Sequence, residues 1–117
     1  MFKRLAELSV DKTFELKGGK DTTTVVNILN SLEMYGTGRL FGVSIIAPGG
    51  SIGKHYHNGD FETYYILKGK AKVDDNGNIV ELGPGDMTQC KDGDFHEIQN
   101  IGDCNLEYIA LILYLGK

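Results

Sequence analysis

Tryptophan is absent from this chain, and proline and cysteine occur only twice each among its 117 residues. Positive charge is also scarce, because 12 Lys and Arg stand against 16 Asp and Glu, which gives a formal net charge of −4. Nucleic-acid-binding domains normally carry a basic patch, and anionic membrane surfaces attract clusters of Lys and Arg. The charge balance therefore argues against nucleic acid or an anionic membrane as a partner.

Long apolar runs are lacking as well. No run approaches the roughly 20 residues that a membrane-spanning helix needs. The first residues, MFKRLAEL, contain no extended apolar stretch of the kind found in secretory signals, so we expect a cytoplasmic location. The spacing of Cys90 and Cys104 is not that of a zinc or redox pair. In a reducing compartment we expect two free thiols, with a disulfide between them as the alternative.

Glycine, in contrast, is abundant, with 16 residues spread between short runs rich in β-branched and aromatic side chains. Asn76-Gly77 is the strongest short hairpin signal in the chain, and no segment shows a sustained 3.6-residue apolar period. The pattern predicts an all-β sandwich or barrel of the jelly-roll kind. Residues 2–8 could form a short helix or an edge strand. The runs that we expect to form strands are 22–29, 39–47, 61–68, 70–74, 79–82, 87–90, 95–101 and 106–115.

Two of the three histidines lie in the sequence His55-Tyr56-His57. In an extended segment alternate side chains share a face, so the two imidazoles would point the same way and Tyr56 the other way. A His-x-His pair alone is a weak signal for a metal site, and a Glu beside it is usually solvated. The longer spacing is more specific: glycine, five residues, His55-x-His57, four residues, Glu62, six residues, glycine.

The third histidine lies in a second spaced pattern, which reads Gly85, seven residues, Gly93, two residues, His96, three residues, Asn100. Together the two patterns resemble the paired motifs of the cupin superfamily over roughly residues 39–113. The chain is similar to small single-domain bacterial cupins, including those like oxalate decarboxylase. One departure is Lys91, which stands where the second motif usually has proline. That change concerns the rigidity of a turn rather than a metal ligand.

The resemblance implies a cupin barrel, which is a double-stranded β-helix or jelly roll. It implies one domain over residues 1–117, with an N-terminal strand segment at 1–38 and the motif-bearing core at about 39–113. It also implies a homodimer, often formed through N-terminal strands. One divalent metal would be bound, and imidazole and carboxylate donors suit Mn, Fe, Ni, Co or Zn. The ligands implied by the resemblance are His55, His57, Glu62 and His96.

Three further residues are weaker candidates for contact with a substrate. Tyr64 shares the parity of Glu62 and should face the interior, where its hydroxyl could bind a ligand or belong to the core. Gln89 could line the interior from the strand before His96, or bond a neighbour on a strand face. Arg39 opens a strand and could pair with a substrate carboxylate, or be an exposed charge at the strand end.

Other residues near the motifs have mainly structural interpretations. Asp60 could act as a base from a rim loop, although such residues usually form turns. We expect Asn100 to bond backbone near the barrel edge. Phe95 and Met87 could form an apolar pocket wall, or pack in the core.

Two functions follow from these predictions. Open positions on a bound metal are typical of catalysis, which favours a metal-dependent enzyme acting on a small carboxylate or a sugar. The reaction types are those of decarboxylases, dioxygenases, isomerases and lyases, among which a fold does not choose. The alternative is a non-catalytic module that binds a small molecule or a metal. Decarboxylation of oxalate would require an acidic residue in a lid, and none is obvious in the sequence.

Overall fold

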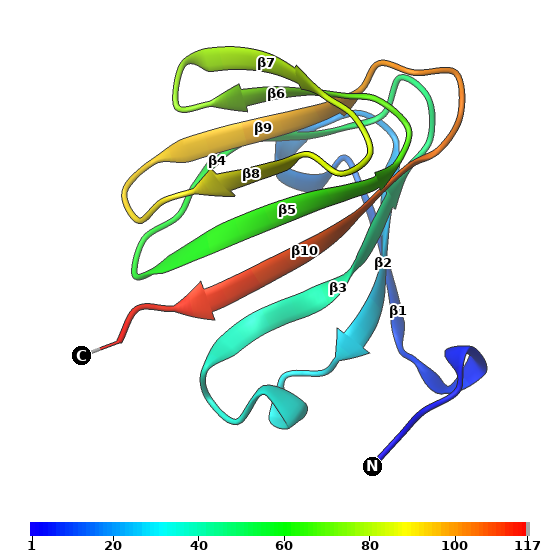
Figure 1. Cartoon of the computed structure of the whole chain (residues 1–117), viewed down its shortest axis with the longest axis vertical. Helices are drawn as coiled ribbons and strands as arrows, with labels where there is room; N and C mark the ends of the chain where they lie inside the picture. The colour runs from blue at the N-terminus through cyan, green and yellow to red at the C-terminus, as the bar shows by residue number, and fades with distance from the viewer. Residues whose placement is uncertain (117) are drawn as a thin grey trace.

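The computed structural model describes residues 1–116 and consists mostly of β-strands, arranged in two antiparallel sheets. One sheet has the strand order β1-β2-β3-β10-β5-β8 and the other has the order β4-β9-β6-β7, as Figure 1 shows. This is the predicted jelly roll. The strands are β1 (Val10–Phe14), β2 (Thr22–Leu29), β3 (Gly38–Ile46), β4 (Ser51–Tyr56), β5 (Asp60–Lys68), β6 (Ala71–Asp75), β7 (Asn78–Leu82), β8 (Met87–Cys90), β9 (Phe95–Asn100) and β10 (Leu106–Tyr114).

The strands agree closely with the sequence prediction, with two additions. β1 was not expected, because all five of its residues are exposed and their pattern carries no apolar face. β4 was expected only as an extended segment around the first two histidines. The chain also forms three short 3-10 helices, η1 (Leu5–Glu7), η2 (Leu16–Gly18) and η3 (Leu32–Met34). The first lies in the segment for which a helix or a strand was predicted.

The predicted hairpin joins β6 and β7. Asn76 and Gly77 both have positive φ, at 50° and 98°, as a type I′ turn requires at its two central positions. The carboxylate of Asp74 accepts a hydrogen bond from the Gly77 N–H at 2.8 Å. The turn pairs Asp75 with Asn78, and this pairing sets the register of the whole hairpin.

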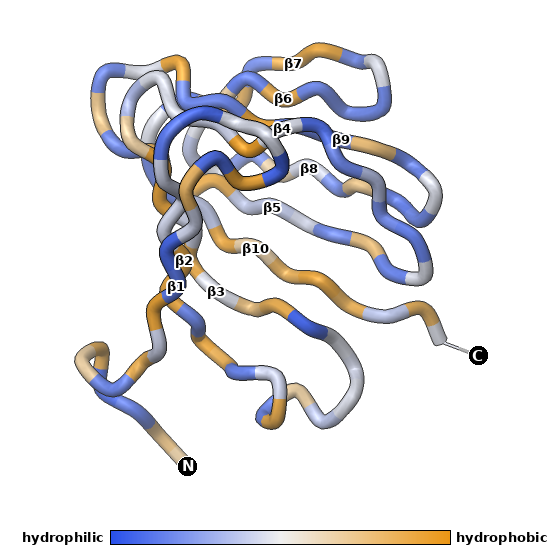
Figure 2. Tube along the Cα trace, turned by 180° about the vertical axis from the view of Figure 1, so that it is seen from behind, coloured by the Kyte–Doolittle hydropathy of each residue, from blue (hydrophilic) through white to orange (hydrophobic). Residues whose placement is uncertain are grey.

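The core lies between the two sheets and follows the period-two pattern of the strands. β3, β5 and β10 alternate buried and less buried residues along most of their length. Figure 2 shows a long hydrophobic stretch along β10. Tyr64 is 2% exposed and Ile66 is fully buried, so the predicted inward parity of β5 is confirmed. The inward residues pack with Ile46, Leu106 and Tyr108.

The two cysteines are free, as predicted, with Cys90 buried and Cys104 exposed. Burial raises the pKa of the Cys90 thiol to about 12, so this group stays protonated at neutral pH. No helix within residues 1–116 combines the length and the hydrophobicity needed to cross a bilayer.

Candidate metal centre

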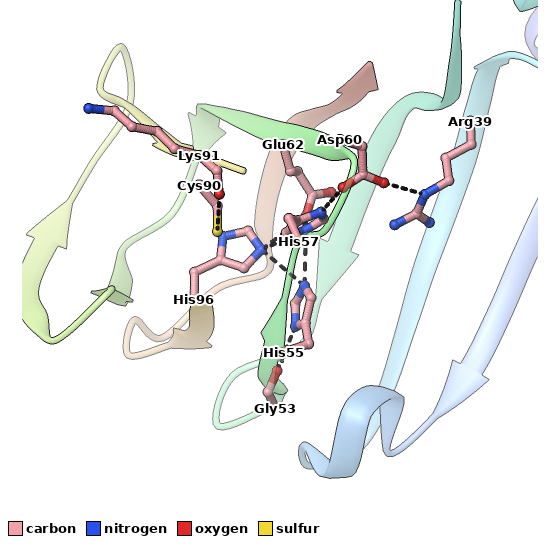
Figure 3. Close-up of polar contacts among 9 residues, drawn as sticks. All are labelled: Arg39, Gly53, His55, His57, Asp60, Glu62, Cys90, Lys91 and His96. Carbon is pink, nitrogen blue, oxygen red and sulfur yellow. Dashed lines mark hydrogen bonds and ion pairs between the residues drawn. The ribbon is translucent and has the colours of Figure 1, made fainter. Parts of the chain in front are cut away.

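Three neighbouring strands bring the histidines and Glu62 together inside the barrel (Figure 3). β4 and β9 are antiparallel, and their register places His55 directly opposite His96. His57 follows the end of β4, two residues after His55, and therefore lies on the same face. β5 belongs to the other sheet and contributes Glu62 from across the interior. The carboxylate and two of the imidazoles are buried, and the His55 side chain is 14% exposed.

The four side chains direct one donor atom each toward a common point. The Nε2 atom of His96 lies 3.0 Å from Nε2 of His55 and 3.2 Å from Nε2 of His57. The Oε1 atom of Glu62 lies 3.0, 3.1 and 3.8 Å from the Nε2 atoms of His96, His57 and His55. Two ligands at right angles, each 2.0–2.1 Å from an ion, are about 3.0 Å apart. The spacing is therefore that of adjacent ligands around one metal ion.

Hydrogen bonding alone cannot satisfy this cluster. The Nε2 atom of His96 lies within 3.2 Å of three possible acceptors, namely Glu62 Oε1 and the Nε2 atoms of the other two histidines. Each imidazole nitrogen carries at most one proton, so a proton on this atom can satisfy only one of the three contacts. A divalent cation at the centre would accept all four lone pairs at once. The donor set, with imidazole nitrogen and carboxylate oxygen, suits borderline transition metals.

The electrostatics of the cluster favour an ionised carboxylate. Burial alone would raise the pKa of Glu62, but the three imidazoles around its carboxylate hold that pKa well below its usual range. The carboxylate of Glu62 raises the pKa of His57, with a smaller contribution from Asp60 against the effect of burial. Burial lowers the pKa of His96 despite the same carboxylate. The anion is thus present at neutral pH, and His96 favours the neutral form that binds metal.

The opposite ring nitrogens of the three histidines have different partners. Nδ1 of His55 lies 2.8 Å from the carbonyl oxygen of Gly53, so it donates there and leaves Nε2 unprotonated. Nδ1 of His57 lies 2.8 Å from Oδ1 of Asp60. Nδ1 of His96 is buried without a hydrogen-bond partner among residues 1–116. The ring of His96 is held instead by Tyr64, which stacks on it with centroids 4.9 Å apart and an interplanar angle of 14°.

A cavity of about 140 Å³ opens beside the cluster. Its walls combine part of the donor set with apolar residues and with two residues that carry cationic side chains, Lys17 and Arg39. Among the residues that line it, Glu62 is the one carboxylate. The lining residues are Leu16, Lys17, Arg39, Leu40, Ile52, His55, His57, Glu62, Tyr64 and Ile112.

The weaker candidates from the sequence have different outcomes. Tyr64 and Arg39 both line the cavity, and Nε of Arg39 also donates to Oδ2 of Asp60 at 2.9 Å. The prediction that Gln89 lines the interior is wrong. Gln89 is exposed because β8 pairs it with Thr63 on the outer face, and the inward position next to Glu62 belongs to Cys90.

Other expectations near the motifs were also tested by the structure. Met87 is 54% exposed and does not form a pocket wall. The structural role of Asn100 is confirmed, because its amide nitrogen donates to the carbonyl oxygens of Ile46 and Cys104 at 2.8 Å each. Asp60, interpreted as a turn former or a base, is instead a buried partner of His57.

Sequence reasoning missed the segment that closes one side of the cavity. Leu16 and Lys17 belong to η2, which packs against β4. The backbones approach so closely that a Cβ atom on Gly53 would lie 2.0 Å from the carbonyl oxygen of Lys17. A Cβ atom on Gly19 would lie 2.1 Å from the carbonyl oxygen of Ser51. The glycines were visible in the sequence, but Gly19 and Gly53 are more than 30 residues apart, and their close approach is a property of the folded chain.

Comparison with known proteins identifies relatives of this chain. The family model described as "Cupin domain" matches residues 42–112. An "oxalate-binding protein" from Thermotoga maritima is 36% identical over 115 residues, which cover 98% of this chain and 95% of the relative. The crystal structure of a "predicted oxalate decarboxylase" from T. maritima is also 36% identical and superposes with a TM-score of 0.92, over 98% of this chain and 100% of that one.

More distant structures share the fold alone. A polyketide cyclase from Streptomyces resistomycificus is 17% identical with a TM-score of 0.74, over 100% of this chain and 87% of that one. A sugar phosphate isomerase from Silicibacter pomeroyi is 17% identical with a TM-score of 0.71, over 96% of this chain and 74% of that one. The same architecture thus occurs with different activities.

Proposed function

The chain belongs to the cupin family, and from this premise we propose that it binds one divalent transition metal and uses it to hold a small carboxylate. The proposed ligands are His55, His57, Glu62 and His96, and the metal is Mn, Fe, Ni, Co or Zn. The observation that carries the proposal is the convergence of four donor atoms that hydrogen bonds cannot satisfy. A metal held there supplies Lewis acidity to an oxygen of the bound molecule.

Two features of the cavity support a carboxylate over a sugar. Its volume, about 140 Å³, lies below the roughly 300–1,000 Å³ of pockets for drug-sized molecules. Two basic residues, Lys17 and Arg39, are among those that line it, within a protein of net charge −4. The guanidinium of Arg39 matches the geometry of a carboxylate. The name of the T. maritima relative, an oxalate-binding protein, agrees with this choice.

The chain's own groups suggest how such a ligand would be oriented. One carboxylate oxygen would lie at the open side of the four donors, beside Tyr64. The apolar walls exclude water. The positively charged Arg39 would pair with the negative charge of the ligand at the mouth of the cavity. Tyr64 is buried, and this burial raises its pKa well above the usual value. It would therefore act as a hydrogen-bond donor and not as a base at neutral pH.

Decarboxylation of a bound carboxylate needs a proton donor, so the acids in the cavity bear on whether the protein is an enzyme. A metal-dependent enzyme of the decarboxylase, dioxygenase, isomerase or lyase type is the first hypothesis. A non-catalytic binding protein is favoured by one observation: among the residues lining the cavity, Glu62 is the only carboxylic acid, and it belongs to the donor set. Turnover of a carboxylate substrate by the metal-loaded protein, lost in His96→Ala, would decide for the enzyme.

Elemental analysis of protein purified without chelator is the direct test of the metal. We expect close to one equivalent of a transition metal in the wild type and in Asn58→Ala, an exposed neighbour of the site. His57→Ala should lose it. Calorimetric titration with oxalate should then give binding to the loaded wild type and none to the metal-free protein. Wild-type protein that holds no metal and takes up none at neutral pH would refute the proposal.

A homodimer in the cytoplasm is part of the same proposal. All five residues of β1 are exposed, and the N-terminal part of the chain also exposes Phe2, Leu5 and Phe14 at 77%, 77% and 69%. A partner strand or sheet would cover these side chains and the free edge of β1. Sedimentation equilibrium should give twice the monomer mass, and Phe14→Asp should shift it toward the monomer. A wild-type mass of one chain at micromolar concentration would refute the dimer.

A further inference from the structure

We propose that Asp60 is a positioning residue for the metal centre and that Arg39 connects it to the mouth of the ligand cavity. The inference rests on the proposed function, because it assigns a role to residues behind a proposed metal ligand. Its basis is one continuous chain of contacts. Oδ1 of Asp60 lies 2.8 Å from Nδ1 of His57, and Nε of Arg39 lies 2.9 Å from Oδ2 of Asp60.

Among the three imidazoles, His57 alone has a carboxylate behind it. The Nδ1 atom of His55 faces a neutral carbonyl oxygen at 2.8 Å, and Nδ1 of His96 has no partner among residues 1–116. A carboxylate at Nδ1 fixes the proton there, presents the lone pair of Nε2 to the centre and makes that lone pair more basic. His57 is also the most enclosed of the proposed ligands together with His96, at 1% exposure each.

Asp60 is as deeply buried as we expect for a carboxylate that serves a specific partner. It is 6% exposed and lies at the first position of β5, two residues before Glu62. A buried carboxylate costs several kcal/mol unless it is paired and hydrogen-bonded, and each of its oxygens has its own partner. Asp60 does not line the cavity. It therefore acts on the centre through the ring of His57 and does not touch the ligand.

Arg39 links this pair to the cavity. Its side chain is 50% exposed and lines the cavity wall, while Nε is used by Asp60. The guanidinium carries further N–H donors on its two Nη atoms, which remain for a carboxylate in the cavity. One planar group can thus contact the ligand and Asp60 at once. Figure 3 shows Arg39, Asp60 and His57 one after another, from the edge of the barrel toward the donor cluster.

The test is titration of Co²⁺ into metal-free protein, followed by calorimetry and by the visible absorption of the bound ion. Loss of an outer partner of a ligating histidine typically weakens metal binding 10- to 100-fold. We expect Asp60→Asn to show a weakening of about that size and a changed cobalt spectrum. Asp103→Asn, the same substitution at an exposed residue, should match the wild type. A purely structural role would lower the melting temperature and leave the spectrum unchanged.

Arg39 is tested by a double-mutant cycle. Arg39→Gln should weaken cobalt binding severalfold in the wild-type background and should have little further effect when Asp60 is already Asn, because its influence passes through that carboxylate. Equal effects of Arg39→Gln in both backgrounds would overturn the link. Should Asp60→Asn fail to fold, Arg39→Gln alone decides, and an unchanged affinity and spectrum in that variant would overturn the inference.

The failure of this inference and the failure of the proposed function give different results. If His57→Ala and Glu62→Gln lose cobalt while Asp60→Asn binds it with wild-type affinity and spectrum, the positioning role is wrong and the metal site stands. If His57→Ala itself binds cobalt like the wild type, the proposed metal site is wrong and the inference falls with it.

Discussion

Glu62→Gln is the substitution that tests the metal centre most sharply. It keeps the size of the side chain and removes the one anionic donor of the four. Glu62 is 4% exposed, and its Oε1 atom lies within 3.1 Å of two imidazole nitrogens. An amide oxygen in that place carries no net charge, and the amide group also brings N–H donors toward imidazole lone pairs. We therefore expect the variant to fold and to bind divalent metal far more weakly.

The expected size of the effect follows from linkage. A metal present at about 1,000 times its Kd stabilises the folded state by about 4 kcal/mol. For a domain of 117 residues, each kcal/mol shifts Tm by roughly 4 °C, so the wild type should gain roughly 15 °C. If Glu62→Gln weakens binding about 100-fold, as loss of even an outer partner can do, about 1.4 kcal/mol remains. The gain then falls to roughly 6 °C.

The assay is a thermal melt of each protein with chelator and with added Mn²⁺ or Co²⁺. The measured quantity is the metal-dependent gain in Tm, so a changed stability of the metal-free variant does not confuse the result. The matched control is Glu81→Gln. The carboxylate of Glu81 is 61% exposed and 3.5 Å from Lys70, also 61% exposed, so its loss should leave the gain at the wild-type value.

The reasoning would be refuted by equal gains in all three proteins. That result would mean that the Glu62 carboxylate contributes nothing to metal binding. The absence of any gain in the wild type, across the divalent ions tried, would refute the metal proposal itself.

Three further predictions concern pH and stability. Because Glu62 raises the pKa of His57 in the metal-free fold, the affinity for metal should begin to fall above pH 6.5. Affinity should fall up to about tenfold per pH unit for each histidine that must lose a proton, and dialysis at pH 4 followed by elemental analysis should find no bound metal. Asn100→Ala removes two buried donors and one acceptor to backbone and should cost about 2–4 kcal/mol in urea denaturation. Gly53→Ala would place a Cβ atom 2.0 Å from the Lys17 carbonyl oxygen and should cost about 3 kcal/mol or more. Gly83→Ala, where the added atom meets nothing within 4 Å, should change stability by less than about 1 kcal/mol.

Local pattern predicted most of the fold. Strands β2 and β8 match their predicted bounds, and the hairpin at Asn76-Gly77 is where its turn chemistry indicated. β1 could not be predicted, because a strand with every residue exposed has no alternation to read. Its pairing with β2 supplies the only reason for its extended form, and that pairing is a property of the folded chain.

In the site, too, local pattern predicted some features, and others depend on how the folded chain pairs its strands. Motif spacing indicated all four donors, and period-two parity placed Tyr64 correctly. The opposition of His55 and His96 depends on the register of β4 against β9, two strands separated by about 40 residues. Gln89 was placed in the interior only because its strand precedes His96, and the alternation along β8 turns it to the exposed face instead. The partnership of Asp60 with His57 was hidden by its resemblance to an ordinary turn aspartate.

The site combines residues that lie in the family's motifs with residues that lie outside them. This difference also bears on what the protein binds. The four donors lie in spacings typical of the family, and distant relatives with other activities share the same barrel. The barrel therefore does not by itself select a ligand. Lys17 comes from η2, and Arg39 comes from the beginning of β3; both precede the region matched by the family model, and both line the cavity. If the ligand is an anion, its selection depends on these two cations. Replacing them should then change which molecules bind and leave the bound metal in place, apart from the severalfold effect that Arg39 exerts through Asp60.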